Sequence, residues 1–417
     1  VARRIFALPW VEAGSHTYSH PLDWETLAQT AAKAETGSRA MEWLDPARWL
    51  VVARVAERWS RPQAEEAKPT LRRGHTHLRS YELYPFHLDQ EVGGSIRFLA
   101  KLLPPGKRVE ILQWSGTAME GEAVLRAVHD AGVRNINGGD TRFDPEFASY
   151  AWVAPLGRQA GKFRQVYSSA SNENTYTNLW NERYFGFRYV MQTLRNTDCP
   201  LRIKPFNLYY HMYSGEKEPS LQAIKENMAA ARAQELAPIS ASRYAAIADG
   251  FYSARITQTG ERRWRIEHRD GLNTVRFDHA DSESVDFANS AGVVGQRRYQ
   301  GSLYVALDSA ETAPAIALVR GRGPKGGWPY LIQSRWQVSK LRREPGSLAF
   351  EAQGFGLGEM EWQAVPGRRY EIQVSGRNGF WQKRYAMADR DGRLLFTAET
   401  AAMEPAEITL REAGLGQ

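Results

Sequence analysis

The sequence predicts an α/β domain followed by a β-sandwich domain, and three observations predict this fold class. The chain has 417 residues, about right for two or three domains. Strand-like and helical segments alternate up to residue 254, the pattern of a parallel sheet. From residue 255 onward, short runs of alternating apolar and polar residues are separated by turn residues, as in antiparallel sandwiches. We therefore expect domains over residues 1–254 and 255–417.

The segments of the first domain are identified from their apolar periodicity, caps and glycines. The expected helices are residues 1–9, 24–66, 88–103, 120–132, 185–197 and 219–236. The expected strands are residues 11–14, 107–114, 133–137 and 202–213. This alternation predicts a parallel sheet that is either open or closed into a barrel.

Polar residues occur at the end of each expected strand, where parallel α/β folds place their chemistry. These strand-end residues are His16 and His20, residues 114–116, residues 137–140, and His211. Because the carboxyl ends of parallel strands meet at one edge of a sheet, we expect these groups to lie close together.

His16 and His20 are a candidate pair of metal ligands. An H-x-x-x-H spacing lets two imidazoles converge on one ion, at a distance of ~2.0–2.1 Å for zinc. The spacing by itself is equally compatible with two polar residues in a turn. Gly14 and Ser15 turn the chain at the strand end, and this context favours the metal interpretation.

His211 and Asp140 are the candidate catalytic residues. A histidine at a strand end is suited to general acid or base work, because its pKa lies near neutrality. The alternative for His211 is a core histidine bonded to a loop. Asp140 either orients a catalytic group or caps its own loop.

Residues 165–180 are dense in amides, hydroxyls and aromatic rings. This mixture suits sugars, since aromatic faces stack on pyranose rings and amides bond hydroxyl groups. A polar surface loop would have the same composition. The candidate substrate-binding residues in this segment and at the strand ends are Trp114, Asn137, Asn172, Tyr176, Trp180 and Tyr210.

Composition excludes several other classes of protein. The single cysteine rules out a disulfide within the chain and a thiolate-rich zinc site. The formal net charge of +7 comes from scattered basic residues without a nucleic-acid motif, so no nucleic-acid partner is expected. No apolar run reaches ~18 residues, and we expect no transmembrane segment.

Five motifs, in order along residues 1–252, carry a family resemblance. They are "EAGSHTYSHP", "LQWSGTA", "NINGGDT", "NENTYTNLW" and "KPFNLYYHMYSG". Together they resemble polysaccharide deacetylases of the NodB-homology type, and more narrowly the deacetylase regions of Pel exopolysaccharide modification proteins. The β-rich segment that follows is also similar to the corresponding part of those proteins.

The resemblance implies a (β/α) barrel that removes acetyl groups from an N-acetylhexosamine exopolysaccharide. The implied setting is the periplasm, during synthesis and export of a biofilm matrix. The family binds Zn²⁺ or another divalent transition metal through one aspartate and two histidines, and His16 and His20 match the two histidines. His211 matches the histidine that protonates the leaving amine, and an exopolysaccharide export component is an expected partner.

The chain departs from the family pattern before Val11, where the aspartate-bearing strand end of the family is missing. We therefore expect an N-terminally incomplete barrel, with the third metal ligand and the catalytic base upstream of Val1. Two imidazoles without a carboxylate should bind zinc weakly.

Two other classes of function stay open. The first is a non-catalytic carbohydrate-binding or export-scaffold protein on the same fold, with the β-sandwich as a further binding domain. The second is a glycoside hydrolase, which needs paired carboxylates. Glu173 and Asp140 are the candidates for that pair.

Overall fold

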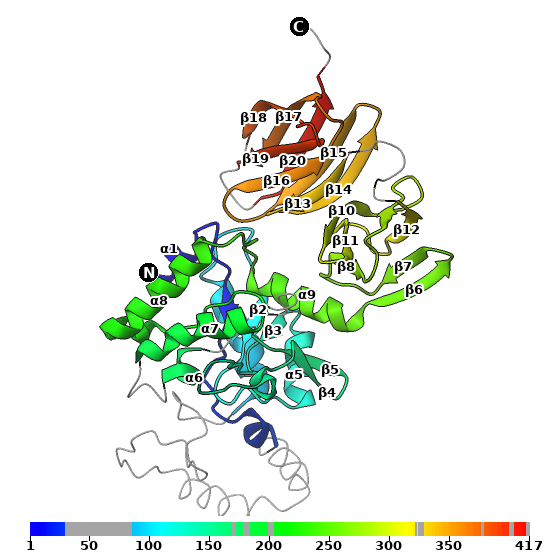
Figure 1. The fold of residues 1–417 in the computed structure, drawn as a ribbon. Coiled ribbons are helices and arrows are strands. Elements are labelled where there is room, and N and C mark those ends of the chain that lie inside the picture. Colours follow the sequence, from blue (N-terminus) through cyan, green and yellow to red (C-terminus); the bar gives the residue numbers. More distant parts are fainter. Residues whose placement is uncertain are drawn as a thin grey trace, which may run out of the picture.

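The computed structural model describes residues 1–29, 86–168, 172–177, 184–198, 204–321, 323, 329–376, 379–399 and 404–413. Figure 1 shows helices gathered around a small sheet in the N-terminal part, and stacked sheets in the C-terminal part. Trp180 and most of the helix expected over residues 24–66 lie outside the described residues.

A three-stranded parallel sheet forms the centre of the N-terminal part. Its strands are β1 (Gly14–Ser15), β2 (Ile111–Gln113) and β3 (Arg134–Ile136), in the order β1-β2-β3. Helix α5 (Glu122–Asp130) connects β2 to β3 and buries Val124, Leu125 and Val128. Its apolar spacing predicted this helix, and the structure confirms it.

Short helices and one hairpin surround this sheet. The helical segments are α1 (Ala2–Phe6), η1 (Gln90–Gly94), α4 (Ser95–Ala100), η2 (Tyr150–Trp152), α6 (Glu173–Thr177), η3 (Tyr184–Arg188), α7 (Tyr189–Asn196), η4 (Met212–Glu216), α8 (Glu218–Arg232) and α9 (Ala241–Ser253). The hairpin consists of β4 (Gly157–Ala160) and β5 (Phe163–Val166). Within the described ranges, no helix is long and apolar enough to span a bilayer.

The expected (β/α) barrel is wrong. In the part of the chain that the structure describes, strands in several sheets make up 34% of the residues and helices 25%, and no sheet closes into a barrel. A barrel requires every strand to be paired on both sides, whereas the described parallel sheet has three short strands. The segment expected as a strand over 202–213 contributes a single bridge between Tyr209 and Asn172. Pro205 lies in that segment and has no N–H to donate to a ladder.

The C-terminal part is built from strands in three larger sheets. They are β6 (Arg255–Gly260), β7 (Arg263–Glu267), β8 (Thr274–Phe277), β9 (Glu283–Val285), β10 (Val293–Tyr299), β11 (Ser302–Leu307), β12 (Ala315–Arg320), β13 (Tyr330–Ser334), β14 (Gln337–Glu344), β15 (Ser347–Gln353), β16 (Gly358–Gln363), β17 (Arg369–Gly376), β18 (Trp381–Met387), β19 (Arg393–Ala398) and β20 (Ala406–Glu412). The sheet orders are β19-β16-β13-β10-β11-β8, β6-β7-β12-β9 and β14-β15-β20-β17-β18.

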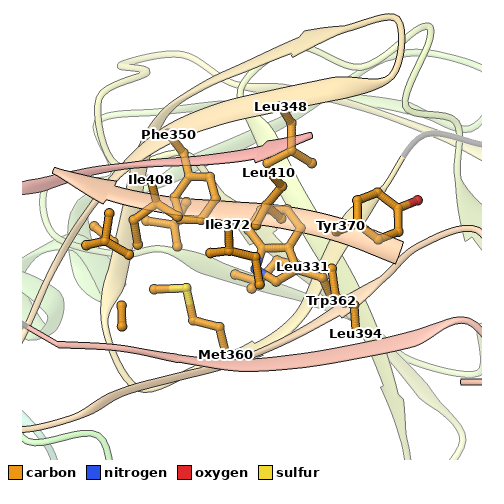
Figure 2. Packing of buried hydrophobic residues seen from close by; sticks show 14 of the residues in the cluster. Leu331, Leu348, Phe350, Met360, Trp362, Tyr370, Ile372, Leu394, Ile408 and Leu410 are labelled. Carbon is orange, nitrogen blue, oxygen red and sulfur yellow. The ribbon is translucent and has the colours of Figure 1, made fainter. Parts of the chain in front are cut away.

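Alternating side chains build the core of the C-terminal part. In β15, Leu348, Phe350 and Ala352 are buried while their neighbours are more exposed, the two-residue period of a sheet with one covered face. Figure 2 shows Phe350 and Trp362 packed together, with ring centroids 4.9 Å apart. The core forms because the inner faces of two sheets interdigitate.

Helix α9 is the element through which the two parts meet. It is followed directly by β6, and the loop after β7 packs back on it, with the Gly271 N–H donating to the Ala246 carbonyl. Arg134 at the start of β3 pairs with Asp249 of α9 and with Asp270 of that loop, each at 2.8 Å. One guanidinium therefore joins the sheet, the helix and the β-rich part.

We predict that Gly250→Ala destabilises this junction. Alanine normally favours a helix over glycine by ~1 kcal/mol. A Cβ at Gly250 would, however, lie 1.9 Å from the backbone oxygen of Arg269. We expect a net loss of about 1–3 kcal/mol in the free energy of unfolding, measured by urea denaturation.

Gly215→Ala is the matched control, because no atom lies within 4 Å of its added Cβ. Equal stability of Gly250→Ala and the parent chain would contradict the tight contact.

Candidate functional site

His16 and His20 follow β1 at the carboxyl edge of the parallel sheet, and their rings lie against each other. The ring centroids are 5.0 Å apart with an interplanar angle of 76°. Two imidazoles bound to one tetrahedral zinc at ~2.0–2.1 Å would have centres roughly 5 Å apart. The relative position of the two rings therefore fits a shared divalent ion.

The protonation state of both rings also fits metal binding. His16 Nδ1 lies 2.9 Å from the Gln113 carbonyl oxygen, an acceptor, so Nδ1 carries the proton and Nε2 keeps its lone pair. Burial lowers the pKa of His16, as does the charge of His211. Burial also lowers the pKa of His20, and the charges of His16 and His211 lower it further. Both imidazoles are thus favoured in the neutral form that binds metals.

A buried carboxylate holds the loop that carries the two histidines. Thr17 and His20 have φ values of 71° and 57°, a region that costs a non-glycine residue about 1 kcal/mol or more. Glu91 Oε2 accepts hydrogen bonds from the backbone N–H groups of Tyr18 (3.0 Å) and Ser19 (2.8 Å), and Oε1 accepts one from the Ser19 hydroxyl. Glu91 is 2% exposed, so it stabilises the loop from inside the protein.

The loop after β2 packs against the end of the histidine loop. The Ser115 hydroxyl donates to the Pro21 carbonyl at 2.8 Å, and the Thr117 N–H donates to the Leu22 carbonyl at 3.0 Å. Gly116 has φ 63°, and a Cβ there would lie 2.4 Å from the Leu22 Cα. This close approach requires glycine, which explains the glycine of the "LQWSGTA" segment.

His211 is backed by the carboxylate of Glu173. Glu173 is fully buried in α6, and its Oε1 lies 3.2 Å from His211 Nδ1. The same oxygen accepts the His211 backbone N–H and the Ser214 hydroxyl, the latter at 2.8 Å. A carboxylate in this position orients an imidazole through Nδ1 and leaves Nε2 as the working nitrogen. A charge on His211 lowers the pKa of both His16 and His20, so His211 lies near this pair.

Asp140 lies at the same edge of the sheet, after β3. Asp140 as a whole residue is exposed, but protein atoms surround its carboxyl group, and this desolvation raises the pKa of the carboxyl. A hydrogen bond with Thr175 lowers that pKa in part. Burial raises the pKa of the Tyr209 hydroxyl, and the negative charge of Asp140 raises it further. The ring centroids of Tyr209 and His211 are 5.2 Å apart. Asp140 is therefore near the histidines, and the structure gives it no hydrogen bond to either ligand candidate among the described residues.

Two of the expected substrate-binding aromatics are core residues. Trp114 is completely buried against Trp24, and its Nε1 donates to Asn135 at 3.2 Å. Tyr176 is 3% exposed, and its hydroxyl bonds the Thr141 carbonyl and the Thr193 hydroxyl. Neither ring offers a face to a sugar, because packing covers both.

The remaining expected residues have mixed placements. Asn137 donates to the Trp114 carbonyl at 2.6 Å and so joins the loops after β2 and β3. Asn172 forms the bridge to Tyr209 and accepts from the Thr175 N–H at the start of α6. Tyr210 is half-buried against the cluster around Phe187. These residues shape the site rather than offer an open binding face.

Two exposed aromatic rings border the histidines instead. Tyr213 is 39% exposed and stacks on His211, with ring centroids 4.9 Å apart and planes 8° apart. Tyr18, between His16 and His20 in the sequence, is 43% exposed. Sequence reasoning missed both residues, although each lies within two positions of a histidine that it had selected.

The donor set for a metal is incomplete in the part of the chain that the structure describes. No group of three or more histidine, cysteine, aspartate or glutamate side chains is arranged there to hold one ion. His16 and His20 fit two positions of such a site, and the described residues do not provide a third protein ligand.

A further buried carboxyl lies in the loop after β2. Glu120 is 1% exposed, and neither of its oxygens is hydrogen-bonded to another described residue. Burial raises its pKa to about 8, while its own backbone amide and Arg158 counteract this only in part. Glu120 is therefore mostly protonated at neutral pH, a state that the sequence did not suggest.

Comparisons with known proteins leave the family open. No family model matches the chain, and no curated protein matches it. One solved structure that aligns with this chain is a rhamnosidase from Novosphingobium sp. PP1Y. The sequence identity is 12% and the TM-score is 0.12. That alignment covers 75% of this chain and 30% of the rhamnosidase chain. A similarity this low carries no argument about fold or function.

We predict that Glu91→Leu destabilises the histidine loop. The apolar side chain leaves the N–H groups of Tyr18 and Ser19 without their acceptor, at roughly 1–3 kcal/mol for a buried donor. Glu91→Gln keeps an acceptor oxygen and should lose less. Urea denaturation measures both variants, and equal losses would show that volume, rather than hydrogen bonding, is what matters at Glu91.

We predict a pH-dependent effect of Glu120→Gln. The folded-state pKa of Glu120, about 8, lies above its ordinary value of 4.5, so the stability it contributes at low pH is lost as the pH rises through 8. The variant stays neutral, and its stability relative to the parent should increase by more than ~1.4 kcal/mol between about pH 5 and pH 9.

Denaturation midpoints at both pH values test this, with the exposed Glu235→Gln as control. A stability difference that does not change with pH would argue against a protonated Glu120.

Proposed function

We propose that this chain carries the histidines of a metal-dependent N-deacetylase acting on an N-acetylhexosamine exopolysaccharide in the periplasm. The observation that carries the proposal is the convergence of three histidines at one sheet edge. His16 and His20 form a pair with metal-ligand spacing, and His211 is backed by a buried carboxylate. A metal held by histidines and an acid that protonates the leaving amine are two of the components that amide hydrolysis at a metal site uses.

His16 and His20 would hold Zn²⁺ or another divalent transition metal. Such an ion supplies Lewis acidity that polarises an acetamide carbonyl and activates water. The residues of this chain prepare for it, since the Gln113 carbonyl fixes the tautomer of His16 and Glu91 fixes the loop. Because burial lowers both pKa values, protons compete with the metal less strongly than they would at exposed histidines.

His211 would act as the general acid. Hydrolysis adds water to the acetamide carbon and breaks the C–N bond, and the departing nitrogen must take up a proton. The Nε2 proton of His211 is the candidate donor, and Glu173 would hold the ring in position through Nδ1. Asp140 remains a proposed orienting residue, since its charge reaches Tyr209 beside the His211 ring.

Tyr18 and Tyr213 are proposed to contact the sugar in place of the buried Trp114 and Tyr176. Both have exposed surface next to the histidines, and an aromatic face suits the C–H face of a pyranose. An export component of the exopolysaccharide system remains a proposed partner of the chain.

The first test measures zinc affinity on the chain itself. We expect His16→Ala and His20→Ala each to weaken Zn²⁺ binding about tenfold or more, in competition with a chromophoric chelator. His279→Ala, at an exposed histidine of the β-rich part, is the control. Binding that survives both site substitutions would remove the metal assignment.

The second test measures acetate release from acetylated hexosamine oligomers, with any sequence that precedes Val1 included in the protein. His211→Gln should lower the rate ~10²–10⁴-fold while leaving zinc affinity unchanged. Retained polymer binding without acetate release in the parent protein would favour the carbohydrate-binding alternative.

A further inference from the structure

A polar cavity lies at the edge of the parallel sheet opposite to the histidines. Its volume is about 550 Å³. The residues before β2 and β3 line one side, and the first turn of α9 lines the other, with Ser240, Ser242 and Arg243. Because the strands are parallel, these amino-terminal ends face away from the edge that carries His16, His20 and His211.

Three arginines, Arg108, Arg134 and Arg243, line this cavity. Two of them already have carboxylate partners, since Arg108 pairs with Glu110 at 2.8 Å and Arg134 pairs with two aspartates. Arg243 is the lining arginine that has no carboxylate partner among the residues that the structure describes.

Arg243 has the environment of a ligand-binding side chain. Its guanidinium makes no hydrogen bond or ion pair to any residue in the described ranges, although it is half-buried. Burial lowers the pKa of the Arg243 guanidinium, and the positive charges of Arg269 and Arg134 lower it further. The negative charge of Asp270 raises this pKa in part. A bound anion would remove this repulsion and complete the hydrogen bonding of the guanidinium.

The end of α9 does not itself provide the anion site. The Ser242 N–H donates to Glu12 at 3.1 Å, and the Ser242 hydroxyl is bonded to the same carboxylate. The Ser240 hydroxyl accepts the Arg243 N–H at 3.2 Å. Because Glu12 occupies the helix N-terminus, the Arg243 guanidinium is the lining group whose donors have no partner among the described residues.

An adjoining cavity has a volume of about 570 Å³ and shares His129, Val133 and Arg134 with the Arg243 cavity. It adds Lys162 and Arg164, whose guanidinium lies 3.7 Å from the Tyr252 ring centroid. Asp249 and Asp270 also line this adjoining cavity and pair with Arg134, so Arg243 remains the arginine that is open to a ligand.

We propose that the Arg243 cavity binds a small oxyanion of the phosphate or carboxylate class. A guanidinium presents paired N–H donors that match two oxygens of such a group. The cavity lies beside the Arg134–Asp249–Asp270 cluster, so a bound anion would stabilise the junction between the two parts of the chain. This proposal is independent of the proposed deacetylase activity, because it uses none of the histidines of that site.

Isothermal titration with inorganic pyrophosphate and with citrate, at constant ionic strength, tests the proposal. We expect saturable binding of at least one probe, with affinity reduced about tenfold or more in Arg243→Gln and less in Arg243→Lys, which keeps the charge but loses the fork. Binding of pyrophosphate alone indicates a phosphate ligand, and binding of citrate alone indicates a carboxylate ligand.

Arg232→Gln, an exposed arginine at the end of α8, controls for net charge. If Arg243→Gln fails to fold, Arg108→Gln provides the same test from the other side of the cavity. Absence of saturable binding by the parent chain, or an equal loss in Arg232→Gln, would overturn the proposal.

Discussion

The buried carboxylate of Glu91 is the interaction on which the histidine site depends. The loop after β1 reverses direction within a few residues and places two non-glycine residues at positive φ. Such a loop leaves backbone N–H groups pointing inward, where water cannot reach them. Glu91 accepts two of them and a hydroxyl, so the His16 and His20 rings are held in one arrangement. Without this acceptor, the alternative conformations of the loop would compete with the one that pairs the rings.

The same edge of the sheet uses buried carboxyl groups in three different ways. Glu91 shapes a backbone loop, and Glu173 orients an imidazole and gathers the residues around it. The Glu120 carboxyl accepts no hydrogen bond from another described residue, and burial keeps it mostly protonated at neutral pH. The residue type is identical in all three, and the surrounding donors decide what each one does.

The two edges of the parallel sheet provide different chemistry. The carboxyl edge carries imidazoles, carboxyl groups and exposed tyrosines, which suit a metal and a sugar. The amino edge carries guanidinium groups, which suit an oxyanion. Helix α9 borders the amino edge and also contacts the β-rich part. The Arg243 cavity therefore lies where the two parts of the chain meet. The separation follows from parallel pairing, because all strands present like ends to the same side.

The sequence by itself determined local elements such as α5, which Gly132 closes, and α8, whose apolar residues repeat with helical spacing, because both signals depend on neighbouring residues. It also selected His16, His20 and His211, but the strand on which it placed His211 is reduced to a single bridge. Tertiary structure alone decided that the strands are too short for a barrel and that Trp114 and Tyr176 belong to the core. It also decided that Glu91, more than seventy residues after the histidine loop, is the acceptor on which that loop relies. Burial and long-range hydrogen bonds depend on which segments meet in space, and no local pattern encodes that meeting.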